Sequence, residues 1–493
     1  MPTLVENYQT PQHIVFASMF GGSSHVNWVL CILDELSKRG HSVTFVTSSI
    51  QRKFAEPYPH VHVMVIKEMK QSGMSTNNSN FIDMAGHIID FSTKDFGDNY
   101  RTYQKIFTDL NASVVLCDYM SSSGCYEAAL AMKIPYIVTM AFALSPDASA
   151  SYINNNAFTM LDSTTLHMSL IDRLKDMFIT PIKIYRRVSP AVQRLNKRRM
   201  EAGCSERGIE GDSHVHRNNL KLVNSLYGIE AARPLGPLVE LVGPILPRHY
   251  DPLTPSLSGF LNKYSRVLYI AFGQHLILTE KDNQLILTAV LASIEAGAYD
   301  GFIWAVGQHP SGALPFDQDK CPFAHIVTWA PQQAILMHPS VSVFLTHGGA
   351  GSMYEGLYAG KRLIVYPFFG DQFPNAYQVK RQGMGEFLQR KSDQQEAKHT
   401  LIRVGLDLDG AYQRNLNRYK ALVQIHARTG PIRGADLVEE VMFASVDGLL
   451  PYRCEHSRYM SVLKAYNLDL YLILFCFLFC IYRLTAKTLE IFS

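Results

Sequence analysis

The stretch VTWAPQQAILMHPSVSVFLTHGGAGSMYEGLYAGKRLIVYPFFGDQFPN, residues 327–375, decides the fold of this chain. Its apolar run Val341–Leu345 predicts a buried strand. A glycine-rich turn follows from His347 to Ser352, and a helical pattern then runs from Met353 to Tyr358. Such a turn points backbone N–H groups at one spot, where the helix dipole adds positive charge. The stretch therefore predicts a phosphate site within an α/β fold.

Side chains around this turn suit the rest of a nucleotide. Trp329 offers a flat face for a uracil base, and Glu355, one turn into the helix, can accept both ribose hydroxyls. Asp371 and Gln372 end a second predicted strand, Leu363–Phe369, at the same sheet edge. Taken singly, Trp329 could be a core residue, Glu355 part of a solvated helix face and Asp371 a turn residue. Their joint order favours binding of a nucleotide sugar.

The segment resembles the donor-binding signature of the UDP-dependent glycosyltransferases. The family pattern W-x-P-Q, H-P-x-x-x-x-F-x-T-H-G-G, E and P-x-x-x-D-Q-x-x-N is filled at every position. The resemblance implies that Asp371 and Gln372 hydrogen-bond the sugar hydroxyls. The UDP-sugar-binding residues that it implies are Gly273, Gln274, Trp329, Ala330, Gln332, His347, Gly349, Ala350, Gly351, Ser352, Glu355, Asp371 and Gln372.

Two positions depart from the common pattern. Many relatives carry an Asn that touches phosphate where this chain has Gly351, and they usually carry Gly–Ser where it has Gly273–Gln274. We expect backbone amides to replace the Asn side chain, so that donor binding survives. Gln274 predicts a different contact to the diphosphate.

A catalytic pair is predicted from two residues that follow strands. His25 lies just after the first predicted strand, and Asp118 ends the strand SVVLC. Ligands of open α/β sheets bind at such carboxyl ends. A neutral imidazole can accept the acceptor's proton, and a carboxylate on its far nitrogen would orient it. The family resemblance assigns these roles, with Asp109 and Asp147 as alternatives for the partner.

Strands and helices alternate in both halves of the chain, which predicts parallel, doubly wound sheets. The front half has predicted strands at His13–Phe20, Ser42–Thr47, Ser113–Cys117 and Pro135–Met140. One helix is predicted at Val26–Lys38, and a second follows the strand Ser113–Cys117 and extends to Met132. The rear half has strands at Arg266–Phe272 and Phe302–Val306 around a helix at Lys281–Glu295. The resemblance implies the GT-B architecture, in which two Rossmann-like domains face a cleft.

The predicted domains follow from this alternation and from a proline-rich bridge. They are an N-terminal tail (1–12), an acceptor-binding domain (13–232), a linker (233–260), a UDP-sugar-binding domain (261–450), a juxtamembrane segment (451–465), a transmembrane helix (466–485) and a short tail (486–493). Residues Ser145–Arg187 are less regular. Similar insertions in relatives line the acceptor pocket and touch the membrane; a core helix pair with a solvated basic face is the alternative.

The C-terminal run LDLYLILFCFLFCIYRL, residues 468–484, predicts a membrane span when extended upstream to Tyr466. A similar anchor ends the animal membrane-bound glucuronosyltransferases, so we expect a single-pass protein of the endoplasmic reticulum. No signal peptide is visible at the N-terminus, which predicts catalytic domains in the cytosol, whereas the animal relatives face the lumen. The sequons at Asn77 and Asn111 matter only if the chain is translocated.

Composition excludes several other classes. The net charge is +3 with 18% charged residues, and no basic tract points to nucleic acid. The eight cysteines form no C-x-x-C pair and are predicted to be buried or membrane-facing thiols. Asp407-Leu408-Asp409 is interpreted as a solvated turn, and the pairs His60/His62 and His214/His216 lack further ligands. We therefore expect neither a metal nor a cofactor, since UDP-sugar is a substrate.

The leading hypothesis is an inverting, metal-independent hexosyltransferase. It would move a hexose, first of all glucose, from a UDP-sugar to a hydroxyl of a small lipophilic acceptor such as a sterol, lipid or xenobiotic. Anchoring in the bilayer would raise the local concentration of such an acceptor. The alternatives are a UDP-glucuronate-dependent enzyme and a non-catalytic membrane subunit that binds UDP-sugar.

Overall fold

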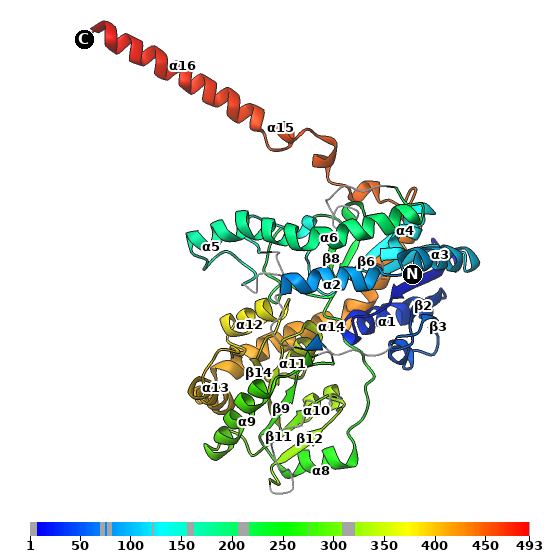
Figure 1. Ribbon diagram of the computed structural model, residues 1–493, viewed down its shortest axis with the longest axis vertical. Helices are drawn as coiled ribbons and strands as arrows, with labels where there is room; N and C mark the ends of the chain where they lie inside the picture. Colours follow the sequence, from blue (N-terminus) through cyan, green and yellow to red (C-terminus); the bar gives the residue numbers. More distant parts are fainter. Residues whose placement is uncertain are drawn as a thin grey trace, which may run out of the picture.

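A computed structural model of the chain describes residues 7–69, 74–75, 81–120, 123–154, 162–205, 216–274, 276–307 and 321–492. Figure 1 shows two α/β lobes stacked on one another and a C-terminal helix that projects away from both. Each lobe is built around its own parallel sheet. The prediction of two Rossmann-like domains is therefore confirmed.

The front lobe contains a sheet with the strand order β3-β2-β1-β5-β6-β7-β8, in which every neighbouring pair is parallel. On the inner strand β1, Ile14 and Phe16 pack towards α1, whereas Val15 and Ala17 pack towards α3 and α4. Burial on both faces explains why these strands are continuous apolar runs. The strands are β1 (His13–Ser18), β2 (Ser42–Ser48), β3 (His62–Lys67), β5 (Val114–Asp118), β6 (Tyr136–Met140), β7 (Lys221–Val223) and β8 (Val239–Leu241); the main helices are α1 (Ser23–Lys38), α2 (Phe81–Thr93), α3 (Phe96–Asp109), α4 (Ser123–Ala131) and α6 (Thr180–Glu201).

The rear lobe contains a parallel sheet with the strand order β12-β11-β9-β13-β14-β15. Its central strand alternates in the same way, with Tyr269 facing one cluster of buried side chains and Ile270 the other. The strands are β9 (Val267–Ala271), β11 (Gly301–Ala305), β12 (Ala324–Val327), β13 (Val341–Thr346), β14 (Arg362–Val365) and β15 (Gly385–Phe387); the helices are α8 (Pro255–Lys263), α9 (Glu280–Glu295), α10 (Gln332–Met337), α11 (Ala350–Ala359), α12 (Gln372–Arg381) and α13 (Gln394–Leu406).

One predicted strand is shorter in the structure. The ladder of β14 ends at Val365, not at Phe369. The N–H groups of Phe368 and Phe369 donate to Oε1 of Gln372, so this segment forms a turn instead of continuing the sheet.

The long helix α14 (Ala411–Ala444) belongs to both lobes. Its first half packs in the rear lobe, and its second half returns to α1 in the front lobe. Gly434 makes this return possible, because a Cβ there would lie 2.4 Å from Cδ1 of Ile32. Strand β8 likewise joins the front sheet from within residues 233–260. The predicted linker, residues 233–260, is thus partly built into the front lobe. The chain also returns from the rear lobe to the front lobe along α14, before the C-terminal segment that leads to α16.

Two cysteines differ from the prediction. Cys117 at the end of β5 and Cys125 in α4 form a disulfide, with Cα atoms 6.0 Å apart. The prediction of thiols at these positions was wrong, because α4 packs onto the strand it follows and brings two residues only eight positions apart into contact. Cys31 is a buried thiol, and Cys476 and Cys480 are exposed on the C-terminal helix.

The C-terminal helix α16 spans Leu468–Phe492. Its segment Leu468–Ala486 is long and apolar enough to cross a membrane, and none of it is buried against the rest of the protein. Asn467, with φ of 54°, separates it from the short helix α15 (Val462–Ala465), so the helix begins two residues later than the predicted span. Asn111 lies exposed in the turn after α3, whereas Asn77 and His214 fall outside the described residues.

Candidate active site

His25 and Asp118 meet at the carboxyl edge of the front sheet. His25 lies in the first turn of α1, which follows β1 through Gly21 and Gly22, and Asp118 is the last residue of β5. Gly21 has φ of 114°, and a Cβ there would lie 2.6 Å from the imidazole. Nδ1 of His25 lies 2.8 Å from Oδ2 of Asp118, and Asp118 is 2% exposed. The structure thus brings together the two residues of the predicted pair.

The surroundings of His25 set its protonation. Burial favours the neutral ring, but the charge and hydrogen bond of Asp118 and the charge of Asp371 together raise the pKa of His25 above its ordinary value. A carboxylate on Nδ1 also leaves Nε2 as the ring nitrogen that can accept a proton. The pair has the arrangement of a general base and its orienting partner.

Tyr119 is a neighbour of this pair that the sequence analysis missed. Its ring stacks on His25 with centroids 5.9 Å apart and an interplanar angle of 17°. Burial, followed by the charges of Asp118 and Asp371, raises the pKa of Tyr119 well above its usual range. The sequence feature that could have identified Tyr119 is its position directly after Asp118, at the same strand end.

The glycine-rich turn after β13 opens helix α11. Gly348 has φ of 84°, and a Cβ at this position would lie 2.4 Å from Cγ1 of Val365. Gly349 is the N-cap of α11 and makes no side-chain cap hydrogen bond, while the N–H of Ala350 in the first turn donates to Oδ2 of Asp371. His347 lies beside Gly273, where a Cβ would come 3.0 Å from the imidazole. The structure thus has the predicted order of a strand, a glycine-rich turn and a helix in this segment.

Gln332 in α10 is hydrogen-bonded to two of the predicted UDP-sugar-binding residues in α11. Its Nε2 donates to Oε2 of Glu355 at 2.5 Å and to Oγ of Ser352 at 3.1 Å. Burial raises the pKa of Glu355 to about 7, against the opposing hydrogen bond from Gln332. Trp329, two residues beyond β12 and followed by the buried Ala330, is 52% exposed, and Nζ of Lys53 lies over its ring at 5.4 Å from the centroid. Trp329 is therefore not a core residue.

Asp371 and Gln372 lie at the start of α12. Oδ2 of Asp371 accepts the N–H of Ala350 in α11 at 3.3 Å, and burial raises the pKa of Asp371 to about 6. Oε1 of Gln372 accepts the backbone N–H groups of Phe368 and Phe369, and the residue is 3% exposed. Asn375, which completes the signature, donates to the carbonyl of Gly348 at 2.8 Å.

The two positions that depart from the family pattern face the front lobe. Nε2 of Gln274 donates to Oγ of Ser23 at 3.4 Å, and a Cβ at Gly351 would lie 3.5 Å from Cβ of Ser24. The amino-terminal ends of α1 and α11 therefore approach each other across the two lobes. Gln274 bridges the lobes in the structure, and an added Cβ at Gly351 would make an ordinary van der Waals contact with Ser24.

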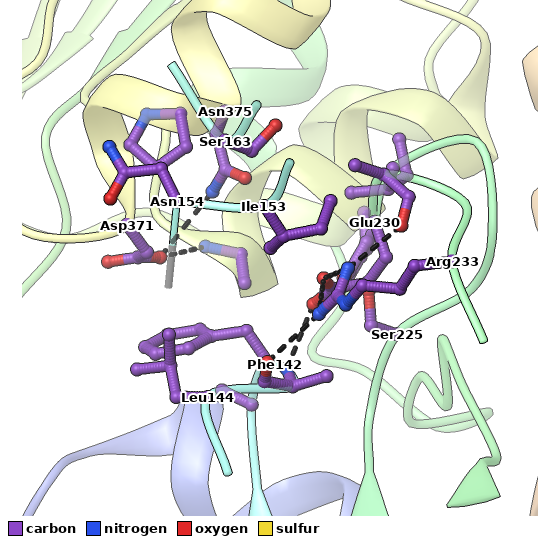
Figure 2. A pocket seen from close by; sticks show the side chains of 17 residues that line it. Phe142, Leu144, Ile153, Asn154, Ser163, Ser225, Glu230, Arg233, Asp371 and Asn375 are labelled. Atoms are coloured by element: carbon purple, nitrogen blue, oxygen red, sulfur yellow. Dashed lines mark hydrogen bonds and ion pairs between the residues drawn. The ribbon is translucent and has the colours of Figure 1, made fainter. Parts of the chain in front are cut away.

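A cavity of about 70 Å³ opens beside Asp371, between the two lobes (Figure 2). Its walls are mainly apolar, with Phe142 and Leu144 on the loop after β6 and Tyr354 on α11. Arg233 also lines it but is 7% exposed, and its guanidinium donates to carbonyls of Ala143, Ala148 and Ala231 and to Glu230. All five of its N–H groups are thereby used.

The residues that could suggest a metal are engaged elsewhere. Asp407 closes α13 with φ of 42°, and its carboxylate accepts the N–H groups of Tyr412 and Gln413. His216 is buried against Tyr136. Within the part of the chain that the structure describes, His, Cys, Asp and Glu side chains do not gather in threes at any point that could hold a metal ion.

Comparisons with known proteins identify the family of the chain. The family model described as "UDP-glucoronosyl and UDP-glucosyl transferase" matches residues 36–433. A UDP-glycosyltransferase of Talaromyces amestolkiae is 28% identical over 90% of this chain and 91% of its own length, and UDP-glycosyltransferase 1 of Phaeomoniella chlamydospora is 28% identical over 78% and 82%. The crystal structure of the glycotransferase of kitacinnamycin superimposes with a TM-score of 0.66 at 18% identity and covers 88% of this chain and 99% of its own. The chain is a GT-B enzyme of the UDP-glycosyltransferase family.

Proposed function

We propose that this enzyme transfers a neutral hexose, first of all glucose, from a UDP-sugar to a hydroxyl of a small lipophilic acceptor, with inversion at the anomeric carbon. The observation that carries the proposal is the 2.8 Å contact between His25 and Asp118. It lies on the sheet edge of the front lobe, where α1 approaches the donor turn of the rear lobe. A scaffold that only bound UDP-sugar would have no use for an oriented base.

In the proposed reaction, Nε2 of His25 takes the proton of the acceptor hydroxyl while Asp118 holds the ring and stabilises the imidazolium. The acceptor oxygen attacks the anomeric carbon from the face opposite UDP, and the bond to the diphosphate oxygen breaks. The N–H groups at the start of α11 and the side chain of His347 receive the charge of the leaving group. One displacement inverts the anomeric centre. Because these groups supply the stabilisation, we propose that no metal is needed, and transfer should persist in excess chelator.

The charges at the cavity favour a neutral sugar over a uronate. A uronate carboxylate next to Asp371 would add a second negative charge in a buried environment. Arg233 is the one cationic side chain among the described residues that line this cavity, and it has no N–H group left to bind a carboxylate. The glucuronate alternative is therefore less well supported.

A lipophilic acceptor is supported by the apolar cavity walls and by an apolar surface on the front lobe. Helix α5 (Leu170–Leu174), the π-helical segment η3 (Lys175–Ile179) and the start of α6 expose a series of apolar side chains with basic residues between them. Figure 1 shows α6 on the side of the front lobe from which the tail leaves towards α16. We propose that this apolar surface, formed by α5, η3 and the start of α6, contacts the bilayer that α16 enters. The exposed apolar side chains are Leu170, Ile171, Leu174, Met177, Phe178, Ile179 and Ile182.

The test is a donor and acceptor panel with detergent-solubilised protein. UDP-glucose, UDP-galactose, UDP-N-acetylglucosamine and UDP-glucuronate are each offered with mixed sterols and phenols, and the products are identified by mass. The expected product is a hexoside from a neutral donor. A product formed from UDP-glucuronate alone would overturn the sugar assignment. A fluorescent fusion tests the proposed location in the endoplasmic reticulum.

A further inference from the structure

The ion pair of Glu230 and Arg233 holds one residue of the cavity wall at both of its backbone groups. Oε1 of Glu230 accepts the N–H of Ala143 at 3.0 Å, and Nη2 of Arg233 donates to the carbonyl of Ala143 at 2.9 Å. The guanidinium and the second carboxylate oxygen of Glu230 are 3.2 Å apart. Figure 2 shows these contacts converging at the cavity edge.

The pair also fixes a longer part of this loop. Nε of Arg233 donates to the carbonyl of Ala148 at 2.5 Å, so the guanidinium spans the loop from Ala143 to Ala148. The side chain of Arg233 is 2% exposed and that of Glu230 14% exposed, so both bonds lie away from bulk water. A planar guanidinium has the fork of donors that this arrangement needs, and an ammonium group does not.

The residues on either side of Ala143 connect the ion pair of Glu230 and Arg233 with the cavity and with His25. Phe142 and Leu144 both line the cavity. The ring of Phe142 meets Tyr119 edge-on with centroids 6.2 Å apart, and Tyr119 stacks on His25. A shift of the Ala143 backbone would therefore move a wall of the cavity and the packing behind the imidazole together.

We propose that Glu230 and Arg233 are positioning residues for the acceptor. They hold Phe142 and Leu144 in the wall against which the acceptor lies, and through Phe142 and Tyr119 they keep His25 aligned with the acceptor hydroxyl. This inference rests on the proposed function, because it takes the cavity beside Asp371 as the place of the acceptor and the transferred sugar.

The test uses Arg233→Lys, which keeps the charge but cannot make all these bonds. The expected result is a rise of at least tenfold in KM for the acceptor and a fall in kcat, with the dissociation constant of UDP unchanged within twofold. The matched control is Arg199→Lys. Arg199 is 1% exposed and bonds Glu127 at 2.6 Å in the same lobe, but it does not line the cavity. The control should lose comparable thermal stability without the rise in acceptor KM.

A second variant covers the case in which Arg233→Lys does not fold. Glu230→Gln keeps an oxygen for the Ala143 N–H but removes the charge that orients Arg233, and it should raise the acceptor KM about threefold or more. Variants that match the Arg199→Lys control, or that change acceptor and UDP affinity in parallel, would overturn the inference. Wild-type protein that transfers no sugar to any acceptor would instead refute the proposed function.

Discussion

Nδ1 of His25 and Oδ2 of Asp118 are 2.8 Å apart, although the residues are 93 positions apart in the chain. Two neighbouring parallel strands, β1 and β5, bring them together, because Asp118 ends β5 and His25 lies in the first turn of α1, which follows β1. A buried carboxylate in this position both orients the ring and raises its pKa.

Asp118→Asn should separate these two effects. The amide keeps the shape but removes the charge that raises the pKa of His25, so the ring stays neutral to lower pH. The acidic limb of kcat/KM should therefore move to lower pH. At the same time kcat should fall, on the order of 10³-fold, because the imidazolium loses its stabilising charge. A pH–rate profile of both proteins measures this, and a limb that stays in place or moves to higher pH contradicts it.

Trp329→Ala should weaken UDP binding while leaving stability intact. The ring is 52% exposed, so its removal opens no core cavity. Stacking of a base on an aromatic ring contributes about 1–3 kcal/mol, which predicts a rise of roughly 5- to 150-fold in the dissociation constant of UDP. Trp329→Phe should retain part of the affinity. Calorimetric titration with UDP checks both variants, and an alanine variant that binds UDP like the wild type would exclude the ring as the base platform.

Glu355 should make nucleoside binding depend on pH near neutrality. Its pKa of about 7 means that the carboxylate is largely protonated at pH 6 and largely ionised at pH 8. The ionised form is the better acceptor for two ribose hydroxyls, so affinity for uridine should rise by up to about tenfold over this range. Uridine has no phosphate to titrate. Glu355→Gln should bind weakly with a flat profile, and a profile unaffected by this substitution would mean that another group titrates.

Gly348→Ala should damage the donor turn. Its φ of 84° costs a residue with a side chain about 1–2 kcal/mol, and the added Cβ would collide with Val365 at 2.4 Å. We expect a lower melting temperature and weaker UDP binding. Gly259→Ala is the control, because this glycine lies within α8 and a Cβ there meets nothing within 4 Å. Equal behaviour of the two variants would contradict the proposed role of the turn.

The sequence predicted most of the fold because the signal lay in short segments. Strands such as β1 and β13 are apolar runs buried on both faces, and Gly348 in the donor turn has a φ of 84°, which few residues other than glycine adopt. The residues of the donor signature and of the His25–Asp118 pair could be named because short sequence motifs at or after strand ends resemble those of a known family.

Contacts between distant segments could not be predicted in this way. The return of α14 to the front lobe depends on Gly434 meeting Ile32, and nothing in the helical pattern names that partner. Arg233 was interpreted as the start of a linker, yet its guanidinium binds a loop 85 to 90 residues earlier in the chain. Such contacts depend on the packing of whole lobes rather than on local periodicity.

The most direct test of the account compares UDP binding with sugar transfer in His25→Ala. The account predicts that the variant binds UDP within about twofold of the wild type but forms no hexoside from UDP-glucose and any acceptor that the wild type uses. A His25→Ala variant with full transfer activity would contradict the assignment of the base and, with it, the proposed mechanism.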